Sequence, residues 1–194
     1  MTLIMWATYP TEGIEVYMDT LVTISSGGVS GEAEKYLVAP GGVVVAGTGA
    51  ADCFEAWMDA LQHASVSGFD DLNELASDVL AGIHAQTFGS DSILATIFHF
   101  GWSDALGSFA ATIYSSRNGF TPELRIRNGL TVRPETSLLV APQSDADYLA
   151  LARRVAREQQ QRPVGDPDRV AIGGRLVMLD ITRTGVDGRI LGSI

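Results

Sequence analysis

The spacing of hydrophobic residues changes several times along this chain, and each change predicts a different kind of element. Short β-branched or alternating apolar runs bounded by turn residues predict strands. The predicted strands cover residues 2–8, 14–18, 35–39, 42–47, 93–100, 108–115, 120–126, 136–141 and 175–182. Proline and glycine at 9–13 and 40–42 predict that the first four strands form two hairpins.

Other segments carry apolar residues three and four positions apart, which is the spacing of one helix face. The predicted helices span residues 50–65, 70–87 and 144–161. We expect Asp70 and Asp71 to cap the second helix, and Ser144 or Asp145 to cap the third. Residues 24–31, rich in serine and glycine, are predicted to form a loop.

The order of these elements predicts the class of fold. Four strands precede two helices, roughly four strands follow them, and a helix and a closing strand end the chain. Strand groups interrupted by helix groups favour an α+β fold, in which helices cover the outer faces of packed sheets. Because we find no repeat, low-complexity tract or linker, we expect residues 1–194 to form a single domain.

Composition and charge narrow the classes of function. The 194 residues are 46% hydrophobic and 19% charged, which is typical of a globular protein with a core. The formal net charge of −10 argues against nucleic acid and anionic membranes as partners. We see no signal peptide and no apolar run of about 18–20 residues, so we expect a cytoplasmic protein.

Cysteine and histidine give no sign of a metal centre. Cys53 is the only cysteine, which excludes an internal disulfide. The three histidines, His63, His84 and His99, lack the spacing of metal ligands. We therefore expect neither a metal nor a cofactor.

Lys35 is the only lysine of the chain, and arginine carries all other positive side-chain charge. An amine, a hydroxyl and a carboxylate can together cleave an amide without histidine. The nucleophile is then an N-terminal Ser, Thr or Cys, and its α-amine, with a pKa of about 8, is the general base. Thr2, Asp19 and Lys35 offer the side chains of such a site, and Gly47 a backbone N–H for the oxyanion.

Four segments of the chain carry a resemblance to a known family: "TLIMWAT" (2–8), "MDTLVT" (18–23), "EKYLV" (34–38) and "AGTGAADC" (46–53). Together they resemble the proteasome β-subunit and HslV group of N-terminal-nucleophile (Ntn) hydrolases. The resemblance implies a four-layer αββα sandwich of two antiparallel sheets flanked by helices.

The resemblance also implies a role for each candidate residue. Thr2, freed by removal of Met1, is similar to the nucleophile of the family. Asp19 and Lys35, sixteen positions apart, are similar to its electrostatic partners, and Gly47 to the oxyanion donor. A ring-shaped homo-oligomer is implied, and an ATPase partner is left open.

The chain departs from the family pattern at several places. "APQSDADY" (141–148) stands where active relatives have a Gly-Ser-Gly turn, so Ser144 is the nearest serine. Ile172 takes the place of a later serine, and Asp168 comes one residue early. Three functions stay open: a threonine hydrolase cleaving peptide or amide bonds, an inactive subunit with a structural or assembly role, and a small-amide acylase.

Overall fold

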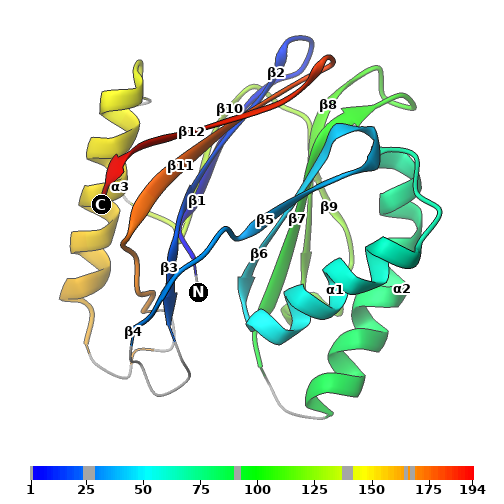
Figure 1. Ribbon diagram of the computed structural model, residues 1–194, viewed down its shortest axis with the longest axis horizontal. Helices are drawn as coiled ribbons and strands as arrows, with labels where there is room; N and C mark the ends of the chain where they lie inside the picture. Colours follow the sequence, from blue (N-terminus) through cyan, green and yellow to red (C-terminus); the bar gives the residue numbers. More distant parts are fainter. Residues whose placement is uncertain (1, 24–28, 90–92, 137–141, 164–165, 167–168) are drawn as a thin grey trace.

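Two five-stranded antiparallel sheets face each other in the computed structural model (Figure 1), which describes residues 2–23, 29–89, 93–136, 142–163, 166 and 169–194. The first sheet has the order β10-β1-β2-β11-β12, with β10 at Gly129–Arg133, β1 at Ile4–Tyr9, β2 at Gly13–Asp19, β11 at Arg175–Thr182 and β12 at Gly185–Ser193. The second has the order β5-β6-β7-β8-β9, with β5 at Tyr36–Ala39, β6 at Val43–Gly49, β7 at Ala95–Ser103, β8 at Ser108–Ser115 and β9 at Glu123–Arg125. A small sheet pairs β3 (Leu21–Thr23) with β4 (Val29–Glu32).

An apolar core fills the space between the two large sheets. Alternate residues of each strand point inward, because successive side chains of a strand lie on opposite faces. The Trp6 ring of β1 packs edge-on against Phe98 and Phe100 of β7, with ring centroids 5.7 and 5.5 Å apart. Edge-on packing is a favoured geometry for aromatic pairs, so these rings join the two sheets.

Helices cover the outer face of each sheet. The helices α1 (Ala51–His63) and α2 (Phe69–Phe88) bury Trp57, Leu72 and their neighbours against the β5–β9 sheet. The helix α3 (Asp145–Gln161) covers the other sheet, where the rings of Tyr148 and Tyr17 stack with centroids 3.8 Å apart. The predicted mixture of antiparallel sheets and covering helices is confirmed, whereas its assignment to the Ntn-hydrolase class stays a proposal.

The two predicted hairpins and all three predicted helices form where the hydrophobic pattern indicated them. The β1–β2 register runs unbroken from Ile4↔Met18 to Tyr9↔Gly13, so the turn between them takes up the intervening residues. Ser144 caps α3 as expected, since its side chain accepts a hydrogen bond from the Asp147 N–H.

The cap predicted for α2 is wrong. Gly68 occupies the cap position of α2 and makes no side-chain cap hydrogen bond. Asp71 instead accepts hydrogen bonds from Ser67, and Asp70 accepts one from Ser103 Oγ at 2.7 Å. Asp70 therefore ties the start of α2 to the β7–β8 turn.

The hydrophobic pattern did not predict the polar strands at the edges of the sheets. β4 lies partly in the predicted loop 24–31, β10 was not predicted, and β12 follows β11, which was expected to close the chain. β12 is largely exposed, so it lacks the apolar alternation of a half-buried strand. Of the strand predicted at 136–141, residues 137–141 lie outside the described part of the chain. Among the described residues, no helix has the length and apolarity needed to cross a lipid bilayer.

His99 of β7 is fully buried under the α1–α2 layer. Its Nδ1 donates to Asn73 Oδ1 at 3.0 Å, because the Asn73 oxygen can only accept, and the ring stacks on Trp57. Burial lowers the pKa of His99 to about 3. The unfolded chain, with a His pKa near 6.5, binds a proton at a pH where the folded protein does not.

His99 is expected to make the protein acid-sensitive. Lowering the pH from 7 to 5 should reduce the free energy of unfolding by about 2 kcal/mol through this side chain, because protonation then favours the unfolded state. Urea unfolding at both pH values should show a smaller loss for His99→Gln than for the wild type. The exposed His63 supplies the control, and a His63→Gln protein that also lost the effect would contradict the assignment.

Candidate functional site

The Asp19 carboxylate at the end of β2 joins three segments that are distant in the sequence. Its Oδ1 accepts hydrogen bonds from the Leu3 N–H at 2.8 Å and from Lys35 Nζ at 3.1 Å. Its Oδ2 accepts a hydrogen bond from the Gly173 N–H at 3.3 Å. Asp19 is 1% exposed, and a buried carboxylate is tolerated when donors of this kind surround it.

Lys35 directly precedes β5 and extends its side chain inward. The side chain is 11% exposed and forms an ion pair with Asp19. Burial lowers the pKa of the Lys35 ammonium, while the Asp19 carboxylate acts in the opposite direction. The two residues predicted to be electrostatic partners are therefore in contact, and Lys35 is held close to the backbone at the start of β1.

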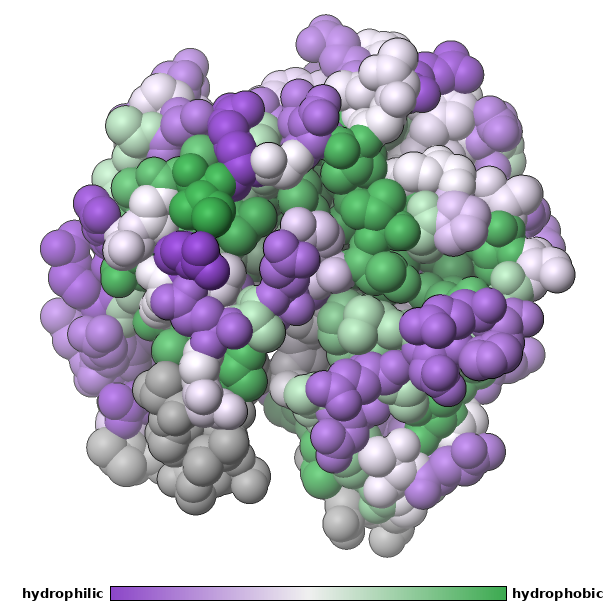
Figure 2. Space-filling view, in the orientation of Figure 1, coloured by the Kyte–Doolittle hydropathy of each residue, from purple (hydrophilic) through white to green (hydrophobic). Residues whose placement is uncertain are grey.

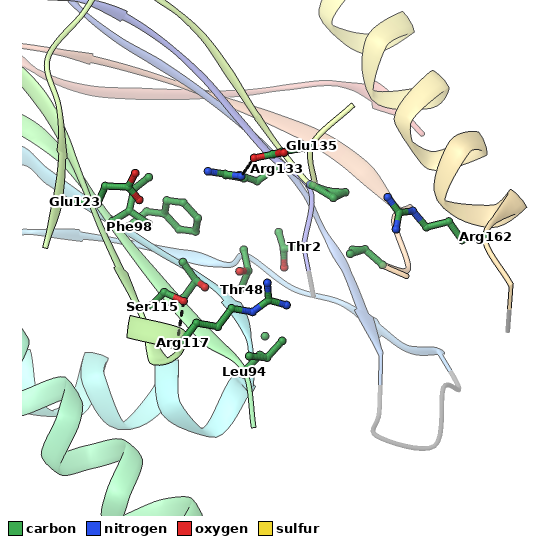
Figure 3. Close-up of a pocket in the computed structure, with 15 residues that line it drawn as sticks. Thr2, Thr48, Leu94, Phe98, Ser115, Arg117, Glu123, Arg133, Glu135 and Arg162 are labelled. Atoms are coloured by element: carbon green, nitrogen blue, oxygen red, sulfur yellow. Dashed lines mark hydrogen bonds and ion pairs between the residues drawn. The ribbon is translucent and has the colours of Figure 1, made fainter. Parts of the chain in front are cut away.

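Thr2 lies at the wall of a cavity of about 470 Å³ at one end of the sandwich (Figure 3). The Leu3 N–H bond to Asp19 fixes the backbone directly after Thr2, and Thr2 is 6% exposed. Figure 2 shows the molecule hollowed between the half that carries α3 and the half that carries α1 and α2. The cavity wall includes apolar side chains (Leu94, Phe98, Ile113 and Val170) and polar ones (Thr48, Thr96 and Ser115).

A second network holds the segment that reaches Asp19. Thr20 Oγ1 donates to Glu32 at 2.9 Å and accepts from the Arg175 N–H at 2.8 Å. Arg175 Nε donates to Glu32 Oε2 at 2.8 Å. These bonds join the ends of β2 and β4 to the start of β11, just after Gly173, and so support the Gly173–Asp19 hydrogen bond.

Gly47 lies apart from the cavity wall. Its N–H donates to the Lys35 backbone carbonyl at 3.4 Å, and a Cβ at this position would lie 2.6 Å from the Phe54 ring of α1. From this end of β6, Thr48 and Gly49 line the cavity instead, and the sequence analysis did not name either as a site residue. The oxyanion role of Gly47 stays a prediction.

The sequence departs from the family pattern at three positions. Two of these residues have structural roles, and the third lies outside the described part of the chain. Ser144 caps α3, and Ile172 is buried in the core beneath α3. Asp168 lies outside the described residues. Three arginines that line the cavity, Arg117, Arg133 and Arg162, were also missed, because local sequence does not indicate that these positions share one cavity wall.

The comparisons with known proteins show a shared fold. No model of a protein family matches the chain, and no curated protein matches its sequence. A solved structure of a helical assembly of the Anbu complex from Pseudomonas aeruginosa is similar, with a TM-score of 0.68 and 12% identity. The match covers 98% of this chain and 86% of the other. The two chains share a fold.

This finding corrects the family assignment that was made from the sequence. The assignment to the proteasome β-subunit and HslV family is wrong, because the similar structure is that of the Anbu complex and no family model matches. The quoted motifs are short, and at 12% identity a common architecture is what the likeness establishes.

The single lysine allows its protonation to be followed directly. A protein labelled at lysine ¹³Cε should give one lysine signal, which titrates below the ordinary pKa of 10.5 because of burial. Asp19→Asn should lower that pKa further, since the carboxylate raises it. Lys35→Arg, which removes the signal, confirms its assignment. A titration at or above 10.5 in the wild type would contradict the burial argument.

Gly47→Ala should destabilise the protein by about 1–3 kcal/mol, because the new methyl group forces the Phe54 ring of α1 to move. Gly82→Ala is the matched control: a Cβ at this position of α2 meets no atom within 4 Å, and alanine favours the helix by up to about 1 kcal/mol. Thermal unfolding of both variants measures the difference. Equal stability of the two would refute the packing role of Gly47.

Proposed function

We propose that this protein is an N-terminal threonine hydrolase that cleaves peptide or amide bonds. The observation that carries the proposal is the double hydrogen bond of Asp19 Oδ1, to Lys35 Nζ and to the N–H that follows Thr2. This arrangement holds an ammonium near a threonine that lines a cavity. A hydroxyl, a charged amine and an enclosed space are the parts that the chemistry needs.

The proposed reaction begins with Thr2 at the N-terminus, after removal of Met1. The Thr2 hydroxyl attacks the substrate carbonyl carbon while the α-amine of the same residue accepts the hydroxyl proton. The amine then passes this proton to the leaving amine as the carbon–nitrogen bond breaks, which leaves an ester on Thr2. Water, deprotonated by the same amine, hydrolyses the ester and restores the hydroxyl.

Lys35 is proposed to keep the α-amine unprotonated. A second positive charge close to the Lys35 ammonium is unfavourable, so the neighbouring amine loses its proton more easily. Backbone N–H groups of the glycine-containing end of β6 are proposed to stabilise the oxyanion. The predicted donor Gly47 already gives its N–H to the Lys35 carbonyl, and the Gly49 N–H, at the end of β6 and on the cavity wall with Thr2, is the further candidate.

We also propose that the layered architecture is the αββα sandwich of the Ntn hydrolases, and that several copies of the chain assemble. The helix, sheet, sheet and helix layers support the first proposal. The similarity to a helical assembly of the Anbu complex supports the second.

An inactive subunit with a structural or assembly role is the second candidate function. Ser144 is used as a helix cap and Ile172 is a core residue, and neither is among the residues that line the cavity beside Thr2. Both observations favour a site that lacks supporting hydroxyl groups. A small-amide acylase is a third candidate function, and it would differ from a peptidase only in the substrates that it cleaves.

Thr2 is expected to be the residue that reacts. Treatment with an epoxyketone or β-lactone should add one inhibitor mass to a protein that has lost Met1, as measured by intact mass spectrometry. Thr2→Ala should abolish the adduct, while Thr11→Ala, in the exposed β1–β2 turn, should keep it. A protein that retains Met1 and gains no mass would favour the inactive subunit.

Lys35→Arg should lower the rate of amide hydrolysis by at least about 100-fold without unfolding the protein. The planar guanidinium is bulkier than an ammonium and stays charged at all accessible pH values. Fluorogenic peptide assays together with circular dichroism check this outcome. A folded Lys35→Arg protein with wild-type activity would exclude the role proposed for Lys35 in the reaction.

A further inference from the structure

One side of the strand β12 lacks a partner strand. β12 runs beside β11 toward the C-terminus (Figure 1), and within the described part of the chain no strand pairs with its outer side. It has nine residues, whereas the other edge strands of the two large sheets, β5, β9 and β10, have four, three and five. An unpaired edge presents backbone N–H and C=O groups that can pair with another chain. β12 is therefore the edge that offers most of these groups.

The exposed part of β12 includes an apolar side chain. Ile190 is 55% exposed, which is the largest exposed fraction among the large hydrophobic side chains that the structure describes. Its register partner on β11 is Val177, and Val186 lies opposite Ile181. Val177 and Ile181 belong to the core between the sheets, so Val186 and Ile190 lie on that face of the sheet, at its open edge. A further strand at this edge would remove the Ile190 side chain from water.

Two charged residues of β12 lie on the opposite face of the sheet, which carries α3. Asp187 lies opposite Asp180 of β11, and carboxylates in directly opposite positions repel each other. The Asp187 carboxylate forms no ion pair or hydrogen bond with any residue that the structure describes. Arg189 binds Asp145, at the start of α3, through Nε and Nη2, so its Nη1 takes part in none of these bonds. β12 thus carries a carboxylate without a cation and a guanidinium with unused donors.

We propose that β12 is an interface between two copies of this chain, which pair in antiparallel orientation about a two-fold axis at Gly188. The proposal rests on the proposed assembly of several copies and names the surface that two of them share. A two-fold axis places the same strand of each copy side by side in opposite directions. Positions equally far before and after Gly188 then lie opposite each other, and the two large sheets that contain β12 become continuous.

This register makes β12 complementary to itself in charge and in apolarity. Asp187 of each copy lies opposite Arg189 of the other, and Val186 lies opposite Ile190. An axis at Asp187 or at Arg189 would instead place like charges opposite each other, so the charges favour Gly188. The β11–β12 register is regular from Gly185 to Ile190, and its irregularity comes after this segment. The occupant that this pattern fits is a second copy of the same strand.

Sedimentation velocity of the full chain over a range of concentrations measures how tightly two copies associate. Ile190→Lys should weaken this association at least about 10-fold, because lysine on an edge strand opposes pairing with another strand. Leu124→Lys is the matched control and should leave the association unchanged. Leu124 is 47% exposed and lies on β9, an edge strand of the other sheet.

Reversed charges test the register. Asp187→Arg and Arg189→Asp should each weaken association at least about 10-fold, because each change places two pairs of like charges opposite each other. Mixing the two variants should restore association, since one then brings two arginines and the other two aspartates to the same positions. Loss of the Arg189–Asp145 pair within one copy would not be reversed by mixing, and circular dichroism checks that each variant is folded.

The outcomes separate this interface from the proposed assembly. Association that is unchanged in Ile190→Lys and in both charge variants would overturn the β12 interface, while the assembly of copies stands. A wild-type chain that stays monomeric at every concentration would overturn both proposals and leave the β12 edge to a different protein. Neither result depends on hydrolysis at Thr2, which is measured separately.

Discussion

The site is organised around one buried ionic interaction, between Asp19 and Lys35. A carboxylate that is 1% exposed is costly unless it is paired and hydrogen-bonded. Asp19 meets this requirement with the Lys35 ammonium and with two backbone N–H groups, from Leu3 and Gly173. Through these three hydrogen bonds, Asp19 fixes the positions of the start of β1, the segment before β5 and the segment before β11 relative to one another.

The rest of the sandwich determines where this interaction lies. The aromatic contacts of Trp6 join the two sheets, while α1, α2 and α3 close their outer faces. The sheet ends at β1 and β6 leave a cavity open beside Thr2. The interior is therefore tightly packed around the strands, and the cavity with its polar lining lies at one end of the sandwich.

The comparison with known structures establishes the fold of this chain but not its family. Short motifs around Asp19, Lys35 and the β6 turn resemble those of one family, whereas the overall structure is similar to a chain of the Anbu complex at 12% identity. A layered fold tolerates extensive replacement of side chains as long as the apolar pattern is kept. Likeness of fold therefore does not fix the side chains of a site, and function has to be argued from the site itself.

The sequence by itself determined the elements whose apolar pattern is strong: the β1–β2 and β5–β6 hairpins, the three helices and the Ser144 cap. It also indicated that Asp19 and Lys35 are partners, and the two side chains form an ion pair. Only the tertiary structure decided the edge strand β12, whose residues are largely exposed, and β10, where the two apolar residues Leu130 and Val132 make too short a pattern to predict a strand. It likewise decided that Thr48 and Gly49, rather than Gly47, line the cavity, and that Arg117, Arg133 and Arg162 line it as well. The physical reason is that strand ends from distant parts of the chain form this site, and local patterns do not encode which ends meet.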